Sequence, residues 1–166
     1  MAADVRPVRI LVLGEPERGD DGAAFAAVPL ALAELSPLVR RRLDVRRTGQ
    51  LDPLDLIDLP TDGWAIVVDA VCGVRPGRIV SLPLGDLTTD RIRPRSTHLL
   101  PVEELIAMAG LVRGAAIPGV FVGVGVSATG LGDGLSPVVS DALPDLVGAI
   151  VEEVVRRVGA PVLVGL

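Results

Sequence analysis

The sequence predicts an open α/β fold: a single-domain, mostly parallel twisted sheet of about five strands with helices on both faces. Three observations lead to this fold class. Short β-rich apolar runs alternate with helical patterns over 166 residues, which is the length of one ordinary domain. The runs are apolar on both faces, as expected for a parallel sheet covered on two sides. No repeat or linker divides the chain, so we treat residues 1–166 as one domain.

The first half of the chain alternates strand and helix signals. The elements expected there are strands over 8–13, 43–47 and 65–69 and helices over 20–35 and 51–59. Gly14 ends the first strand, and Pro29 should kink or split the first helix. The third strand is strongly apolar until its last residue, Asp69.

The second half continues the same alternation. Its expected elements are strands over 78–82 and 119–126, a helix over 101–113 and a final helix that opens at 136–137. Pro101 suits the first position of its helix. In the final helix, Ser136 is expected as the N-cap and Pro137 as the first residue.

Composition excludes several classes of protein. The net charge of −5 argues against a nucleic-acid partner, which would need clustered positive charge. Cys72 is the only cysteine, so no intramolecular disulfide forms and a reducing compartment fits. The apolar runs are too short or too interrupted for a membrane span, and the start of the chain lacks a secretory signal pattern. We expect a cytoplasmic monomer without a membrane partner.

Three polar residues fall at the carboxyl ends of the predicted strands. Asp21 follows the first strand, Asp69 ends the third, and His98 follows the fourth. Ligands of open α/β sheets collect at this edge. An imidazole with two carboxylates suits a divalent metal such as nickel or zinc, and separated carboxylates could also perform acid/base chemistry.

Each of these residues also has a structural interpretation. Asp20 is expected to be the N-cap of the first helix, and Asp21 could be a first-turn acid that the helix dipole favours. Asp69 could be satisfied by nearby backbone amides, and a lone histidine can be structural. Cys72 could be a nucleophile assisted by His98 with Asp69 orienting the imidazole, or simply a small buried apolar residue.

At these residues the chain resembles the hydrogenase maturation proteases. The resemblance runs from Val8 to about Val155 and is carried by four segments in order: "ILVLG" leading into "RGDDG", "AIVVDAV", Ser96-Thr97-His98, and "GLSP" before the last helix. It implies an endopeptidase that removes the C-terminal extension of a nickel-loaded nickel-iron hydrogenase large-subunit precursor. It also implies that Asp21, Asp69 and His98 are the catalytic metal ligands. The nickel would be supplied by the substrate, so the isolated protein would be metal-free.

The chain departs from the family pattern beside the first acidic motif. Where the family has a glycine-asparagine segment, this chain has Glu15. This departure motivates a second hypothesis, a non-catalytic binding module that recognises the metal site and acts as a maturation chaperone. A cysteine hydrolase centred on Cys72 is the third.

Overall fold

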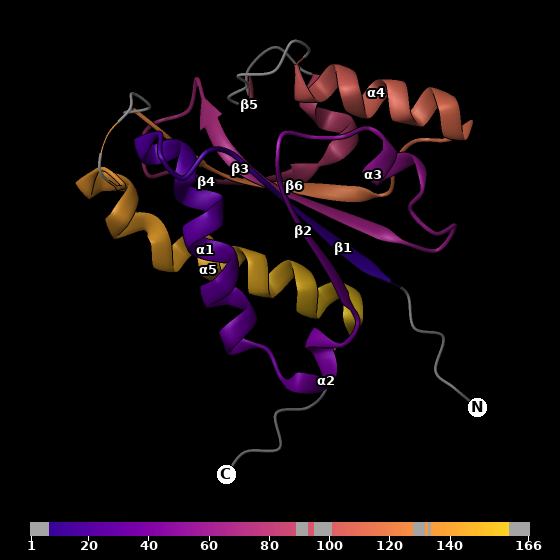
Figure 1. The fold of residues 1–166 in the computed structure, drawn as a ribbon, viewed down its shortest axis with the longest axis horizontal. Coiled ribbons are helices and arrows are strands. Elements are labelled where there is room, and N and C mark those ends of the chain that lie inside the picture. The colour runs from indigo at the N-terminus through magenta and orange to yellow at the C-terminus, as the bar shows by residue number, and fades with distance from the viewer. Residues whose placement is uncertain (1–6, 89–92, 95–100, 128–131, 133, 160–166) are drawn as a thin grey trace.

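The protein is built on one twisted sheet, shown by a computed structural model that describes residues 7–88, 93–94, 101–127, 132 and 134–159 (Figure 1). The strand order is β2-β1-β3-β6-β4. The four parallel strands are β1 (Val8–Leu13), β2 (Leu43–Gly49), β3 (Trp64–Cys72) and β6 (Gly119–Gly125). Two strands are antiparallel: β4 (Ile79–Pro83) pairs with β6, and the two-residue β5 (Arg93–Pro94) pairs with the end of β3. The predicted fold class, a mostly parallel sheet, is confirmed.

Helices cover both faces of this sheet, as Figure 1 shows. On one face lie α1 (Ala23–Glu34), α2 (Pro37–Arg40) and α5 (Pro137–Val158). On the other lie α3 (Leu54–Ile57), the short helix η2 (Leu84–Thr88) and α4 (Val102–Arg113). We call these the α1/α5 face and the α3/α4 face. The short helix η1 (Gly19–Gly22) connects β1 to α1 at the carboxyl ends of the strands.

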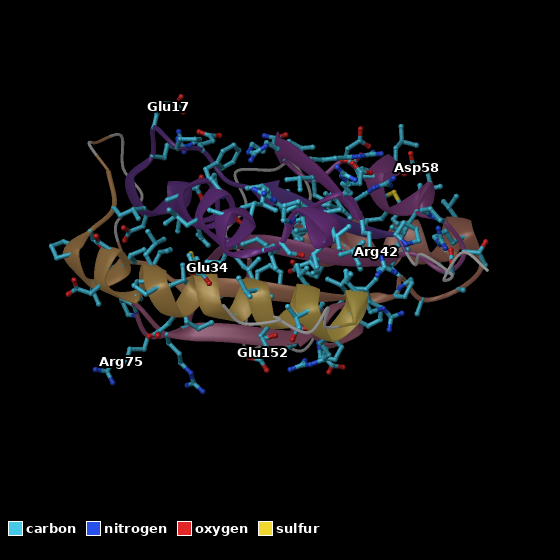
Figure 2. The ribbon with its side chains drawn as sticks, turned by 90° about the horizontal axis from the view of Figure 1, so that it is seen from below. Glu17, Glu34, Arg42, Asp58, Arg75 and Glu152 are labelled. Carbon is cyan, nitrogen blue, oxygen red and sulfur yellow. The ribbon has the colours of Figure 1, made fainter. Side chains whose placement is uncertain are left out.

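The two cores follow from the alternation of side chains along each strand. In β1, Ile10 and Val12 pack on the α1/α5 face, whereas Leu11 and Leu13 pack on the α3/α4 face. All four side chains are fully buried, and Figure 2 shows side chains filling the space between the layers. Complete burial of each such side chain contributes about 1.5–3 kcal/mol, which fixes the face toward which each residue of the strand points. Only residues on the face of a site can contribute side chains to it.

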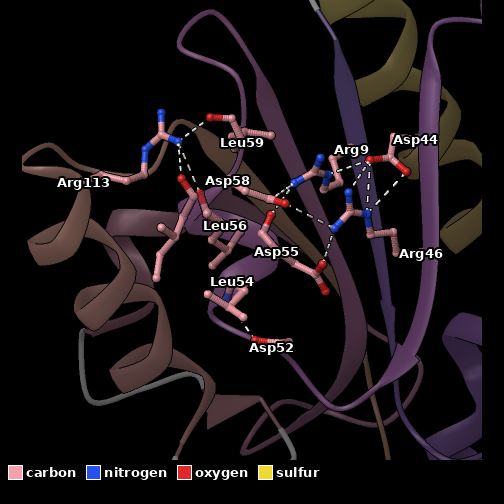
Figure 3. Close-up of polar contacts among 11 residues, drawn as sticks. Arg9, Asp44, Arg46, Asp52, Leu54, Asp55, Leu56, Asp58, Leu59 and Arg113 are labelled. Atoms are coloured by element: carbon pink, nitrogen blue, oxygen red, sulfur yellow. Dashed lines mark hydrogen bonds and ion pairs between the residues drawn. The ribbon is translucent and has the colours of Figure 1, made fainter.

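A partly buried ion network fastens α3 to the first two strands (Figure 3). Arg9 of β1 donates to the Asp44 carboxylate at 2.7 Å and to the backbone oxygen of Asp55 at 2.7 Å. Its guanidinium also pairs with Asp58, and Arg46 pairs with both Asp44 and Asp55. Every carboxylate of this network therefore has an arginine partner.

The structure corrects three local expectations. The third strand continues to Cys72, three residues beyond Asp69, because β6 and β5 go on pairing with it after β1 has ended. Helix α1 runs through Pro29 without being split. Pro101 is the N-cap of α4 and precedes its first residue.

Helix α2, η2 and β5 were not expected from the sequence. Among the described residues, no helix is both long enough and apolar enough to cross a membrane.

Candidate functional site

Asp69 is the most unusual polar residue of the sheet. Its side chain lies on the α3/α4 face between Val67 and Val71, and the residue is only 1% exposed. One carboxylate oxygen, Oδ1, accepts a hydrogen bond of 2.8 Å from the backbone N–H of Ala70. The other, Oδ2, is buried and has no hydrogen-bond partner among the described residues. An unsatisfied buried acceptor costs about 1–3 kcal/mol, so this oxygen calls for an explanation.

The position of Asp69 still corresponds to the carboxyl edge of the sheet, although β3 extends further. The last residue pair between β1 and β3 is Val12–Val68, so Asp69 lies just where its neighbour β1 ends. On its other side it is opposite Gly123 of β6, which has no side chain. Asp69 is therefore bordered by the end of one strand and by a glycine of the next.

Asp21 belongs to η1, which contacts β3, and its charge acts on Asp69. It is 3% exposed, and its Oδ2 accepts a hydrogen bond of 2.8 Å from the backbone N–H of Glu15. Its backbone sits directly over Gly14, which has a φ of +109°, and a Cβ atom at Gly14 would collide with the Asp21 carbonyl oxygen. The loop after β1 thus needs a glycine to bring Asp21 to this edge.

The electrostatics couple the two carboxylates. Burial raises the pKa of Asp69 well above its ordinary value, and the charge of Asp21 raises this pKa further. The hydrogen bond from Ala70 acts in the opposite direction and does not cancel the effect of burial. Two predicted site residues from distant segments are therefore brought together, and Asp69 is held in an environment that disfavours its negative charge.

Asp20 has a different role from the expected one. The N-cap of α1 is Gly22, and Asp20 makes no capping bond to that helix. Its carboxylate accepts hydrogen bonds from the backbone N–H of Ser136 at 2.6 Å and from the Ser136 hydroxyl at 2.8 Å. Ser136 is the N-cap of α5, as expected, but its side chain makes no capping bond. Asp20 therefore joins η1 to the start of α5, a contact across 116 residues that local pattern could not reveal.

His98 lies outside the described residues. The described elements on either side of it are β5, which pairs with Val71 and Cys72 at the end of β3, and α4, which contacts β5. Within the described residues, no group of three histidine, cysteine, aspartate or glutamate side chains could hold a metal ion. The predicted ligand role of His98 therefore stays a prediction.

Cys72 does not join the two carboxylates. It is partly buried and packs against the core of the α1/α5 face, whereas Asp69 lies on the α3/α4 face. Residues three apart in a strand point to opposite sides of the sheet. The structure therefore gives no support to an arrangement in which Asp69 orients a histidine toward Cys72.

Sequence reasoning missed two residues that position the candidate site. The backbone N–H of Glu15 holds Asp21, and Gly14 makes room for it. The only available signal was the glycine directly after the first strand, which was interpreted as the end of that strand. Almost any residue type can make such a backbone contact, so the sequence does not reveal it.

Solved structures of known proteins share this fold. The hydrogenase maturating endopeptidase HybD from E. coli superposes with a TM-score of 0.70, covers 92% of this chain and 94% of its own, and is 17% identical. The [NiFe] hydrogenase maturation protease HybD from Thermococcus kodakarensis has a TM-score of 0.64 with 21% identity, covering 88% of this chain and 97% of its own. The two thus define the class of fold, that of the hydrogenase maturation endopeptidases.

The sequence itself assigns the family. The chain belongs to the HycI hydrogenase maturation protease family, whose model matches residues 52–153, more than half of the chain. No curated protein matches it significantly in sequence. The resemblance found in the motifs is therefore confirmed at the level of the family.

Proposed function

We propose that this protein is an endopeptidase that removes the C-terminal extension of a nickel-loaded nickel-iron hydrogenase large-subunit precursor. One observation carries the proposal: the buried Asp69 carboxylate beside Asp21, with an oxygen that has no partner among the described residues. Family membership supports the class of reaction, and the nickel-bearing precursor is what the family resemblance implies.

The chemistry of Asp69 suits a cation that arrives with the substrate. A carboxyl group with a raised pKa retains its proton until a positive charge comes close, and a bound metal ion displaces that proton. Asp69 Oδ2 is then available to coordinate a cation. The nickel belongs to the substrate, so cleavage waits for correct metal insertion.

Asp21 and His98 complete the proposed ligand set. Asp21 adds a second carboxylate that is already oriented by the N–H of Glu15. His98 adds an imidazole, a ligand type that suits nickel, and the β5 segment that precedes it pairs with the end of β3. Held in this way, the metal anchors the precursor and can polarise the scissile carbonyl or an attacking water.

Removal of either a carboxylate or the imidazole tests the proposal. Asp69→Asn and His98→Ala should each slow tail removal from the nickel-loaded precursor at least about 100-fold, because loss of even an outer partner of a metal site costs 10–100-fold. Asp62→Asn, at an exposed residue just before β3 begins and therefore at the opposite edge of the sheet, is the matched control and should cleave normally. Processing is measured by the change in precursor mass. Full activity of both site variants would contradict the proposal.

The non-catalytic binding module remains the competing hypothesis. Its motivation was Glu15, which replaces the asparagine of the family pattern. In this chain, the Glu15 backbone orients Asp21, while its side chain pairs with Arg18 at 2.9 Å. The altered side chain is therefore compatible with a complete site. Stable capture of the intact nickel-loaded precursor without any processing would favour the binding module over the protease.

The cysteine hydrolase makes a separate prediction. If Cys72 were the nucleophile, Cys72→Ala would abolish processing. Because Cys72 and Asp69 lie on opposite faces of the sheet, we expect Cys72→Ala to process the precursor at the wild-type rate.

A further inference from the structure

A cavity lies at the amino ends of the parallel strands, at the opposite edge of the sheet from Asp69. Its volume is about 340 Å³, within the range of small-molecule sites. It is formed where β3 and β6 begin, where β4 ends, and by the last turns of α5. Apolar walls come from Leu82, Pro83 and Val120, and polar groups come from Trp64 and Arg157.

Two hydrogen-bond donors that line this cavity find no acceptor in the described part of the chain. The indole N–H of Trp64 and the Nε–H of Arg157 are both buried without a hydrogen-bond partner among the described residues. The two groups are neighbours, because the Arg157 guanidinium stacks 3.9 Å from the centre of the Trp64 ring. Two adjacent buried donors without an acceptor are uncommon, because each costs free energy unless something accepts from it.

Among the described residues, the charges around the cavity do not compensate Arg157. Glu153 is buried, but its carboxylate already accepts from Arg156 at 2.7 Å and from the Ser81 hydroxyl at 3.3 Å. No ion pair joins Arg157 to a carboxylate within the part of the chain that the structure describes. A third arginine, Arg42, lies by the end of α5 in Figure 2 and donates to the backbone oxygen of Val158 at 3.0 Å. The excess charge at this edge is therefore positive.

We propose that this cavity binds a carboxylate that carries a small apolar group. The two oxygens of a carboxylate can accept one N–H each from Trp64 and Arg157, and its charge compensates the Arg157 guanidinium. The apolar group packs against Pro83 and Val120. This site is separate from Asp21 and Asp69, because it lies at the amino ends of the parallel strands rather than at their carboxyl ends.

Trp64 is the only tryptophan, so its fluorescence reports on this cavity directly. The first titration uses 4-methylpentanoate, and 4-methylpentanamide has the same shape without the charge. We expect 4-methylpentanoate to change the Trp64 fluorescence saturably, with a dissociation constant on the order of 1 mM or tighter. The amide should change the fluorescence much less at the same concentrations. Equal responses to both, or saturation by neither, would overturn the proposal.

Variants separate the two donors. Arg157→Gln should weaken carboxylate binding at least about tenfold, because a hydrogen bond from a charged donor is lost. Trp64→Phe, followed by calorimetry, keeps an aromatic ring but removes the indole N–H and should also weaken binding. Arg75→Gln is the matched control, since Arg75 is exposed and lies near the carboxyl end of β6, at the opposite end of the molecule from Arg42 in Figure 2, and it should bind like the wild type. Unchanged binding in both Arg157→Gln and Trp64→Phe would contradict the assignment.

The carboxylate could come from a free acid or from the end of a peptide. An acetylated tripeptide that ends in leucine with a free carboxylate, compared with its C-terminal amide, distinguishes the two sources. Tighter binding of the peptide acid than of 4-methylpentanoate identifies a peptide terminus, and the reverse order identifies a small acid. Equal binding of the peptide acid and the peptide amide would overturn the carboxylate requirement.

Discussion

The α3/α4 face of the sheet carries two groups of carboxylates with opposite surroundings, one partly exposed and one buried. In the ion network under α3, Asp44, Asp55 and Asp58 are all paired with Arg9 or Arg46 (Figure 3). At the carboxyl edge, Asp69 is more deeply buried than any of these, yet one of its oxygens has no partner among the described residues. Within the described residues, arginines pair with the first group of carboxylates, and none pairs with Asp69.

This difference separates a structural role from a functional one. Buried carboxylates that hold a fold together are paired, because an unpaired charge in a low-dielectric environment is costly. A carboxylate that is left unsatisfied lowers stability, and such residues cluster where a protein binds or reacts. The ion network therefore explains how α3 is held, while the unsatisfied oxygen of Asp69 is the observation behind the proposed cation site.

The largest effect on stability and processing is expected from a substitution that displaces Asp21 and leaves the ion network intact. Gly14→Ala forces a Cβ atom against the Asp21 carbonyl at a positive φ, and should cost about 3 kcal/mol of stability and most of the processing activity. Gly114→Ala is the matched control, since Gly114 also has a positive φ but nothing lies near its Cβ position. It should cost only about 1 kcal/mol and leave processing intact. Denaturant unfolding measures both, and equal losses in the two variants would show that Asp21 is not held as described.

A smaller effect distinguishes the two kinds of carboxylate by stability alone. Asp55→Asn weakens a pair with Arg46 and should lower the free energy of unfolding by about 1–3 kcal/mol, while processing by the folded protein continues. Asp69→Asn removes a buried carboxylate that has few stabilising contacts among the described residues, and should not lower the free energy of unfolding at pH 7. Urea unfolding of the two variants side by side is the measurement. A comparable loss of stability in Asp69→Asn would mean that Asp69 is structural after all.

The smallest effect is a pH dependence of opposite sign in the two groups. Burial tends to raise the pKa of Asp44, but hydrogen bonds and charge from Arg9 and Arg46 outweigh it, and the pKa is lowered from 3.8. Asp44 therefore stabilises the fold above its unfolded pKa, and this contribution is lost as the pH falls through the lowered value. The pKa of Asp69 is raised, so its contribution is present below 3.8 and is lost as the pH rises through the raised value.

Unfolding free energies from about pH 3 to about pH 8 test this contrast. In the wild type, the free energy of unfolding declines as the pH rises through the raised pKa of Asp69, and Asp69→Asn should reduce this decline. It also declines in acid as Asp44 becomes protonated, and Asp44→Asn should reduce that loss. Curves of Asp69→Asn and wild type that run parallel over the whole range would contradict the assigned direction for Asp69.

Sequence pattern predicted the sheet because its strands are buried on both faces and read as continuous apolar runs. It placed Asp21 and Asp69 at one edge, and the structure brings them together. It failed where the partner is far along the chain: Asp20 was expected to cap its own helix but binds Ser136 instead. For the same reason, nothing in the sequence joined Trp64 to Arg157, which are 93 residues apart. Whether His98 joins the two carboxylates stays a prediction.

We propose above that Asp21, Asp69 and His98 recognise nickel carried by the precursor. The most direct test of this proposal is to incubate the purified protein with equal amounts of nickel-loaded and nickel-free precursor and to follow tail removal by mass. We predict that only the nickel-loaded precursor is shortened and that Asp69→Asn shortens neither. Equal cleavage of the two precursors by the wild-type protein would contradict recognition through the metal.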